Sequence, residues 1–253
     1  AGCNALSATP SMWRKLSMLP GFEALPLQQI TLGGEIVDQA VLDLLKHHFP
    51  QARITHIYAS TEAGVGFAVR DGKAGFPAAF LHTPPGNVLL RIDENSHLWF
   101  AAAPGTSRLA GLAIVDTADK PTSAEVDDGW LDSGDVVQVQ GERVLFLGRA
   151  NGSINVGGNK VMPEEVEGVI KALPQIAFVQ VRARKSGVLG SLVEAAVKLV
   201  PGQVLDAVSK KQITAHCRAH LEGFKVPAFI VELAEIELTA SGKLSRVDKV
   251  NPT

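Results

Sequence analysis

Apolar side chains recur with two different periods over the N-terminal part of the chain. Helical spacing in residues 36–45 predicts a helix, and the shorter apolar runs 28–32 and 53–59 on either side predict strands. A further helix is expected over residues 11–19, where Pro20-Gly21 ends it. An order of strand, helix and strand is typical of an α/β layer, and we expect such a layer here.

The pattern changes between residues 66 and 147, where short apolar runs are separated by Gly, Pro and Asn. Such runs are typical of short strands, and Gly141-Glu142 between two of them predicts a hairpin. The expected strands are 87–92, 98–101, 136–140 and 144–147. We therefore expect a compact β region after the α/β layer.

A second, smaller domain is expected after Gly148. Pro163 and the two glutamates after it predict a helix over residues 163–173, because Pro suits the first turn and acidic side chains suit the positive helix end. Another helix is expected at 213–221, and strands at 177–183, 192–200 and 228–233. This order suggests a small α+β domain. We place the boundary within Gly148–Gly152, which divides the chain into residues 1–148 and 149–253.

Composition excludes some classes of function. The 253 residues carry a net charge of −2, which gives no reason to expect a nucleic acid partner. No apolar run approaches the roughly 18 residues that a membrane-spanning helix needs. Two cysteines without a CxxC pattern argue against a disulfide scaffold, so we expect a cytoplasmic protein. The first residues lack both an initiator Met and a signal peptide, and we expect the chain to be cut from a longer one.

Four segments are candidates for chemistry, and each also has a simpler explanation. Tyr58-Ala59-Ser60-Thr61-Glu62 ends a predicted strand, at the edge where open α/β sheets bind ligands. Its side chains offer a stacking face, phosphate hydrogen bonds and a Mg²⁺ ligand, and a polar turn is the alternative. The segment from Gly129 to Asp135 ends in a carboxylate that suits ribose hydroxyls, and a capped turn is the alternative.

The other two segments lie at and beyond the predicted domain boundary. The stretch from Gly148-Arg149 through Gly157-Gly158 is Gly-rich and leads into a helix, so its backbone can approach a ligand closely. A linker between domains is the alternative. Thr239 to Arg246 places Lys243 on a Ser/Gly loop, where a compact positive charge can reach phosphate oxygens. A flexible basic tail is the alternative.

In this order and at this spacing, the four segments resemble the motifs of the ANL superfamily. This family contains acyl- and aryl-CoA synthetases, adenylation domains of peptide synthetases, and luciferases. Tyr58–Glu62 resembles its Tyr-Gly-x-Thr-Glu motif, and Ser133-Gly134-Asp135 is similar to its Ser/Thr-Gly-Asp motif. The other resemblances are carried by Gly33-Gly34-Glu35, Gly148-Arg149 with Pro163–Glu167, Gly223-Phe224-Lys225-Val226-Pro227, and Ser241-Gly242-Lys243 with Arg246. The likeness covers essentially the whole chain.

The resemblance implies the C-terminal part of such an enzyme: the end of a large α/β domain with its β region, then a small mobile α+β domain. It implies an AMP-forming carboxylic acid–thiol ligase. Such an enzyme adenylates an acid with ATP and Mg²⁺, and then passes the acyl group to CoA or to the phosphopantetheine of a carrier protein.

The resemblance also implies roles for single residues. Lys243 would stabilise charge on the α-phosphate and the carboxylate, Glu62 would hold Mg²⁺, and Thr61 would contact phosphate. Tyr58 would lie against adenine, and Asp135 and Arg149 would take the ribose. The remaining nucleotide contacts would come from Gly33, Gly34, Glu35, Ala59 and Ser60. Rotation of the small domain would then bring Gly157-Gly158 to the thiolation tunnel.

The sequence departs from the family pattern in three places. The Ser/Thr/Gly-rich phosphate loop is absent, so we expect it upstream and expect the chain alone to show little ATP–pyrophosphate exchange. Asn151 stands where the hinge residue is commonly Asp or Lys, and Ala59 replaces a usual Gly. An adenylation domain that serves a carrier protein and a non-catalytic accessory fragment both stay open, and the sequence does not indicate which acid is used.

Overall fold

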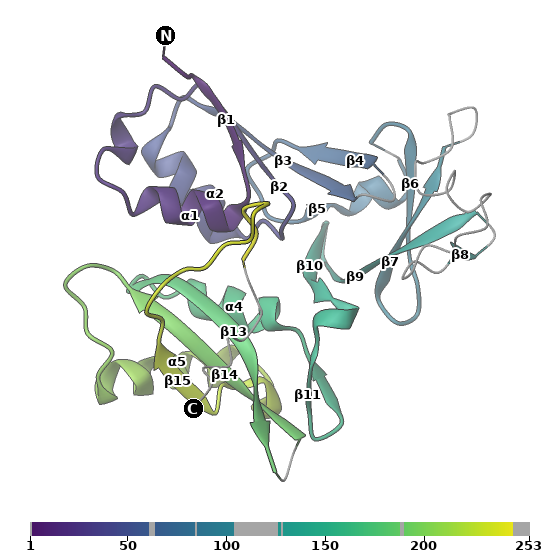
Figure 1. Cartoon of the computed structure of the whole chain (residues 1–253). Helices are drawn as coiled ribbons and strands as arrows, with labels where there is room; N and C mark the ends of the chain where they lie inside the picture. Colours follow the sequence, from purple (N-terminus) through teal and green to yellow (C-terminus); the bar gives the residue numbers. More distant parts are fainter. Residues whose placement is uncertain are drawn as a thin grey trace. The chain divides into compact units, whose positions relative to one another are not determined.

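The computed structural model describes residues 2–60, 64–83, 85–103, 126–127, 129–187 and 190–244. Figure 1 shows the chain, which divides into two compact units. Unit 1 contains residues 1–8 and 23–153, and unit 2 contains residues 9–22 and 154–253. Residues 9–22 therefore belong to unit 2, although unit 1 flanks them in the sequence. The division into residues 1–148 and 149–253 stays a prediction.

A four-stranded sheet forms the α/β layer of unit 1. Strands β1 (Ala5–Ala8), β2 (Gln29–Gly33) and β3 (Arg53–Ser60) are parallel neighbours, and β4 (Gly64–Val69) pairs antiparallel with β3. The predicted strands β2 and β3 are confirmed. Strands β1 and β4 were not predicted: β1 consists mostly of small residues, and β4 is interrupted by Gly64 and Gly66.

Helix α2 (Gln39–His48) connects β2 to β3, as predicted. It begins at Asp38, whose carboxylate accepts a hydrogen bond from Val41 N at 3.1 Å and so satisfies a backbone donor that lacks a helical partner. Its apolar stripe is buried, as expected for a helix that covers a sheet. The buried residues of this layer include Ile30, Leu32, Val41, Leu42 and Leu45.

The β region of unit 1 is an antiparallel sheet in the order β5-β10-β9-β7-β6, with β8 beside β9. A two-residue turn at Gly141-Glu142 joins β9 to β10, and Gly141 has a φ of +57°. The predicted hairpin is therefore confirmed. The strands are β5 (Phe76–Pro77), β6 (Val88–Ile92), β7 (His97–Ala102), β8 (Val126–Asp127), β9 (Trp130–Gln140) and β10 (Arg143–Arg149).

Unit 2 contains a five-stranded sheet in the order β12-β11-β14-β13, with β15 parallel to β14. Its strands are β11 (Ile154–Val156), β12 (Asn159–Val161), β13 (Ile176–Ser186), β14 (Gly190–Leu199) and β15 (Phe229–Glu232). Its helices are α1 (Pro10–Ser17), α4 (Pro163–Lys171) and α5 (Ala207–His220). Short 3-10 turns in the two units are η1 (Phe22–Ala24), η2 (Ala78–Leu81), η3 (Ala150–Gly152) and η4 (Gly223–Lys225).

Helices α4 and α5 pack on the same face of this sheet and share one apolar core with it (Figure 1). Val166 and Ile170 of α4 and Ile213 of α5 are fully buried there. They share this core with alternate residues of β13 and β14, whose side chains lie on one face of the sheet. The predicted α+β character of this part of the chain is confirmed. The hairpin β11–β12 was not predicted, because each of its strands has only three residues.

A buried carboxylate joins α4 to the outer strand of this sheet. Glu167 is 3% exposed, and its Oε1 accepts a hydrogen bond from Val181 N at 2.9 Å. Its Oε2 lies 3.7 Å from Lys171 Nζ, one helical turn away. Since β13 is last in the strand order, Glu167 supplies a partner for an N–H that has no neighbouring strand.

None of the helices in the described ranges has both the length and the apolarity needed to cross a bilayer.

We expect Glu167→Ala to destabilise the chain by about 1–3 kcal/mol, because it leaves the buried Val181 N–H without its acceptor. Glu167→Gln keeps an acceptor oxygen at this position and should cost less. Urea unfolding followed by circular dichroism measures the difference. The exposed Glu235 lies outside the helices and strands, and Glu235→Ala should change stability by no more than about 0.5 kcal/mol. Equal losses for the two Glu167 variants would contradict the capping role.

Candidate functional site

Three predicted site residues of unit 1 meet around one buried carboxylate. Asp135 is 5% exposed, and it accepts a short hydrogen bond from the Tyr58 hydroxyl at its Oδ2. Arg149 Nε lies 3.2 Å from its other oxygen, Oδ1. Tyr58 comes from β3, Asp135 from β9 and Arg149 from the end of β10. These residues are far apart in sequence, and the two sheets of unit 1 bring them together.

Local backbone bonds fix the place of Asp135. Gly134 has a φ of +70°, which favours glycine, and its N–H bonds Asp132 Oδ1 at 2.8 Å. The Ser133 hydroxyl accepts the Asp135 N–H at 3.0 Å. Asp135 also pairs directly with Arg149 in the β9–β10 register. The backbone of Ser133-Gly134-Asp135 and the strand register therefore place the Asp135 carboxylate beside Arg149.

The Tyr58 ring belongs to an aromatic cluster. It stacks on Phe67 with ring centroids 5.3 Å apart and on Phe146 with centroids 5.0 Å apart. Phe100 lies 5.3 Å away at a tilt. This packing holds the ring in one orientation and directs the hydroxyl at Asp135. The adenine contact of Tyr58 stays a prediction.

Burial dominates the electrostatics of this pair. It raises the pKa of Asp135, and the hydrogen bond from Tyr58 and the charge of Arg149 act against that rise. Burial also raises the pKa of Tyr58, and the charge of Asp135 adds to this effect. Tyr58 is thus a firm hydrogen-bond donor. Arg149 keeps 56% of its side chain exposed, so it can reach toward a bound molecule.

The other predicted nucleotide contacts lie near the ends of β2 and β3. Gly33 pairs with Ile57, the neighbour of Tyr58, and a Cβ at Gly33 would lie 3.3 Å from Ile57 O. Gly34 follows with a φ of +79°, and Glu35 continues the same bend. Ala59 and Ser60 are the last residues of β3. Thr61 and Glu62 lie outside the described residues, so their roles stay predictions.

Two predicted segments belong to unit 2. Gly157 and Gly158 form the two-residue tip of the β11–β12 hairpin, with φ angles of +57° and +93°. Both are exposed, and Gly158 N bonds Asn155 Oδ1 at 2.8 Å. The hairpin runs into α4, where Lys225 Nζ bonds Glu165 Oε1 at 2.8 Å and so ties η4 to the helix. Gly157 and Gly158 therefore lie at the exposed end of a hairpin, and the helix that follows the hairpin is bonded to η4.

Lys243 lies on a closed turn and not on a loose tail. Thr239 N bonds Lys243 O at 2.7 Å, and Gly242 N bonds Thr239 O at 2.9 Å. The Thr239 hydroxyl accepts Lys243 N at 3.1 Å, and Leu238 bridges to Leu244. We call residues 238–244 the lysine turn. Lys243 is exposed on it, while the neighbouring Gly242 is buried.

Several partners of these residues were not predicted. Phe67, Phe100 and Phe146 surround Tyr58, and α1 contacts the lysine turn through Thr9, whose hydroxyl donates to Gly242 O at 2.5 Å. Phe100 and Phe146 lie on strands that the sequence predicted and Phe67 lies on one that it did not, and the sequence did not show that the three rings meet.

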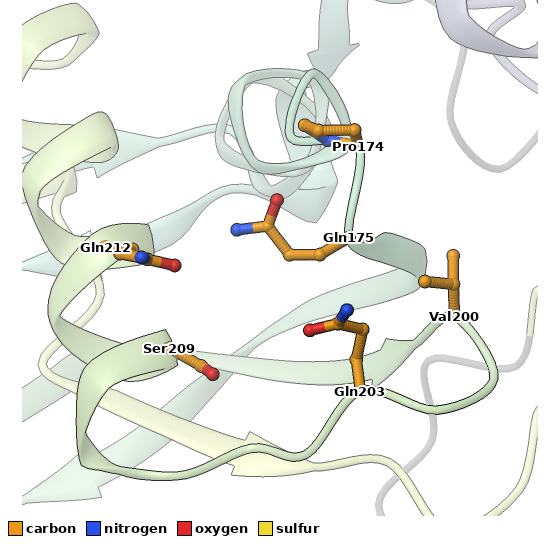
Figure 2. A pocket seen from close by; sticks show the side chains of 6 residues that line it. All are labelled: Pro174, Gln175, Val200, Gln203, Ser209 and Gln212. Carbon is orange, nitrogen blue, oxygen red and sulfur yellow. The ribbon is translucent and has the colours of Figure 1, made fainter.

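A shallow pocket in unit 2 contains none of the predicted site residues. It has a volume of about 360 Å³, and Figure 2 shows side-chain amides and a hydroxyl directed into it. Its lining has no charged group, so it does not match a phosphate or carboxylate site. The lining residues are Pro174, Gln175, Val200, Gln203, Ser209 and Gln212.

Comparisons with known proteins agree with the motifs. Residues 165–243 match the family described as AMP-binding enzyme C-terminal domain. The chain is 30% identical to an indoleacetate--CoA ligase of Aromatoleum aromaticum, over 88% of this chain and 44% of the ligase. It is 27% identical to surfactin synthase subunit 1 of Bacillus subtilis, over 96% of this chain and 7% of that subunit. The chain thus spans less than half the length of these relatives.

A solved structure shows the same fold. A variant of E. coli MenE with bound OSB-AMS matches with a TM-score of 0.70 and 24% identity, over 97% of this chain and 50% of the MenE chain. At that coverage the match extends over both units. On the family match and these relatives, the chain belongs to the ANL superfamily, and residues 165–243 form its AMP-binding enzyme C-terminal domain.

Proposed function

We propose that the chain forms the C-terminal part of an AMP-forming carboxylic acid–thiol ligase. In the proposed reaction, the carboxylate oxygen of an acid attacks the α-phosphate of ATP, and pyrophosphate leaves. A thiol then attacks the acyl carbon of the adenylate, and AMP leaves. CoA is the proposed acceptor, because the indoleacetate--CoA ligase covers most of this chain at 30% identity.

The geometry of the lysine turn is the observation that carries this proposal. Backbone and hydroxyl bonds close the turn around Lys243 and leave its ammonium group exposed. A flexible tail would have to lose conformational freedom before its charge could act, whereas this turn is already ordered. A positive charge held in this way suits the charge that develops on the α-phosphate and the carboxylate during adenylation.

The residues around Asp135 suit the ribose of a nucleotide. Each carboxylate oxygen has a second acceptor site beyond its bond to Tyr58 or Arg149, so ribose hydroxyls can donate to it. In the proposed complex Tyr58 and Arg149 hold the carboxylate in place. The proposed Mg²⁺ would be held by Glu62, which lies outside the described residues.

A carrier-protein acceptor is the second candidate. Surfactin synthase subunit 1 aligns with 96% of this chain at an identity similar to that of the CoA ligases. Free CoA and a phosphopantetheine-loaded carrier protein present the same thiol. Competition between the two acceptors in thioester formation separates these candidates.

We expect Lys243→Ala in the intact protein to lower acid-dependent ATP–pyrophosphate exchange by about 100-fold or more, as removal of one charge-stabilising group does in other enzymes. A panel of acids assayed for AMP release first identifies the substrate. Lys210→Ala is a matched control, because Lys210 is an exposed lysine of the same unit. Exchange that survives Lys243→Ala unchanged would rule out the proposed role of the lysine.

We expect AMP affinity to fall as the pH drops through the raised pKa of Asp135, since only the ionised carboxylate accepts two ribose hydroxyls. Tyr58→Phe removes a hydrogen bond that lowers this pKa, so the decline should move to higher pH. Calorimetric titration of the intact protein with AMP at a series of pH values measures the shift. Glu142→Gln changes an exposed hairpin residue and should leave the profile in place. An identical profile for Tyr58→Phe would contradict the role of this pair.

A further inference from the structure

We propose that Thr9 is a positioning residue for Lys243, because its hydroxyl docks the lysine turn onto the first turn of α1. The inference rests on the proposed role of Lys243 in adenylation. It assigns a second task to the residue that caps α1.

The Thr9 hydroxyl makes two hydrogen bonds at once. It accepts Met12 N at 3.2 Å, which caps α1, and it donates to Gly242 O at 2.5 Å. A hydroxyl has one donor and two acceptor sites, so both bonds are compatible. Thr9 is 9% exposed and Gly242 is buried. Water therefore competes weakly for the bond between them, which strengthens the attachment.

Close packing supports the same contact. Gly242 has a φ of +77°, and a Cβ built there would lie 3.6 Å from Met12 Cε and 3.7 Å from Thr9 Oγ1. The glycine thus lets the turn lie directly against α1. A second bond holds the start of the segment, where Lys15 Nζ donates to Ile236 O at 3.4 Å. Helix α1 therefore contacts the segment 236–242 at both of its ends.

These contacts fix the backbone on which Lys243 is mounted and leave its side chain exposed. Adenylation depends on where the ammonium group lies, and a misplacement of about 1 Å can cost about 100-fold in rate. Without the Thr9 bond the turn keeps its internal hydrogen bonds but loses its attachment to α1. The expected defect is therefore in adenylation. Thioester formation from a preformed adenylate does not use the docked lysine and should be spared.

Two substitutions separate docking from helix capping. Asp is as good an N-cap as Thr and accepts Met12 N, but its carboxylate cannot donate to Gly242 O. Ser keeps both the acceptor and the donor. Thr9→Asp thus keeps the cap, removes the docking bond and sets a carboxylate that repels Gly242 O, and Thr9→Ser is the matched control. Circular dichroism and thermal unfolding confirm that both variants fold.

The main experiment measures both half-reactions in the intact protein with the acid found in the panel. We expect Thr9→Asp to lower ATP–pyrophosphate exchange by about tenfold and Thr9→Ser to stay within about twofold of wild type. Thioester formation from a synthetic acyl-adenylate should stay within about twofold for both variants. Equal losses in both half-reactions would show a general structural role, and unchanged exchange in Thr9→Asp would exclude docking. Either result overturns the proposal.

A second measurement does not depend on activity. Limited trypsin digestion of the intact protein cuts after exposed lysines only where the backbone can open locally. We expect cleavage after Lys243 to be several-fold faster in Thr9→Asp than in Thr9→Ser, and cleavage after Lys210 of α5 to be unchanged. Equal cleavage after Lys243 in the two variants would contradict docking. Unchanged exchange in Lys243→Ala, by contrast, would reject the proposed function and leave the proteolysis result to decide docking.

Discussion

The structure of unit 1 depends on one buried carboxylate. An ionised Asp135 without partners would be costly at 5% exposure, since water would no longer solvate its charge. Tyr58 from one sheet and Arg149 from the other supply those partners, so the α/β layer and the β region are joined through a polar contact inside an aromatic cluster. Asp135 therefore contributes both to the stability of unit 1 and to the candidate site that it forms with Tyr58 and Arg149.

The sequence predicted the helices and strands that are long enough to show a regular spacing of apolar residues. Helix α2, the strands β2 and β3, and the hairpin of β9 and β10 follow from apolar spacing and turn residues, which are local properties. The sequence did not predict β1, whose residues Ala5–Ala8 are mostly small, or the β11–β12 hairpin, whose strands are too short to show alternation. These elements are ordered by pairing with distant strands, and no local window contains that information.

The candidate site divides in the same way. Motif residues such as Asp135 and Lys243 could be found from the sequence, because their chemistry and spacing are distinctive. Their partners could not. The bond between Thr9 and Gly242 spans 233 residues, and Phe67 and Phe146 have the same pattern as any buried strand residue. The sequence indicates which groups act, and the fold determines what holds them.

The place of α1 in the chain has a consequence for folding. Residues 9–22 belong to unit 2 but continue at both ends into unit 1, so the chain passes between the units at 8–9, at 22–23 and at 153–154. Unit 2 therefore cannot complete its fold until both of its segments are present. The hydrogen bond between Thr9 and Gly242 spans 233 residues, and a contact of such high sequence separation forms late.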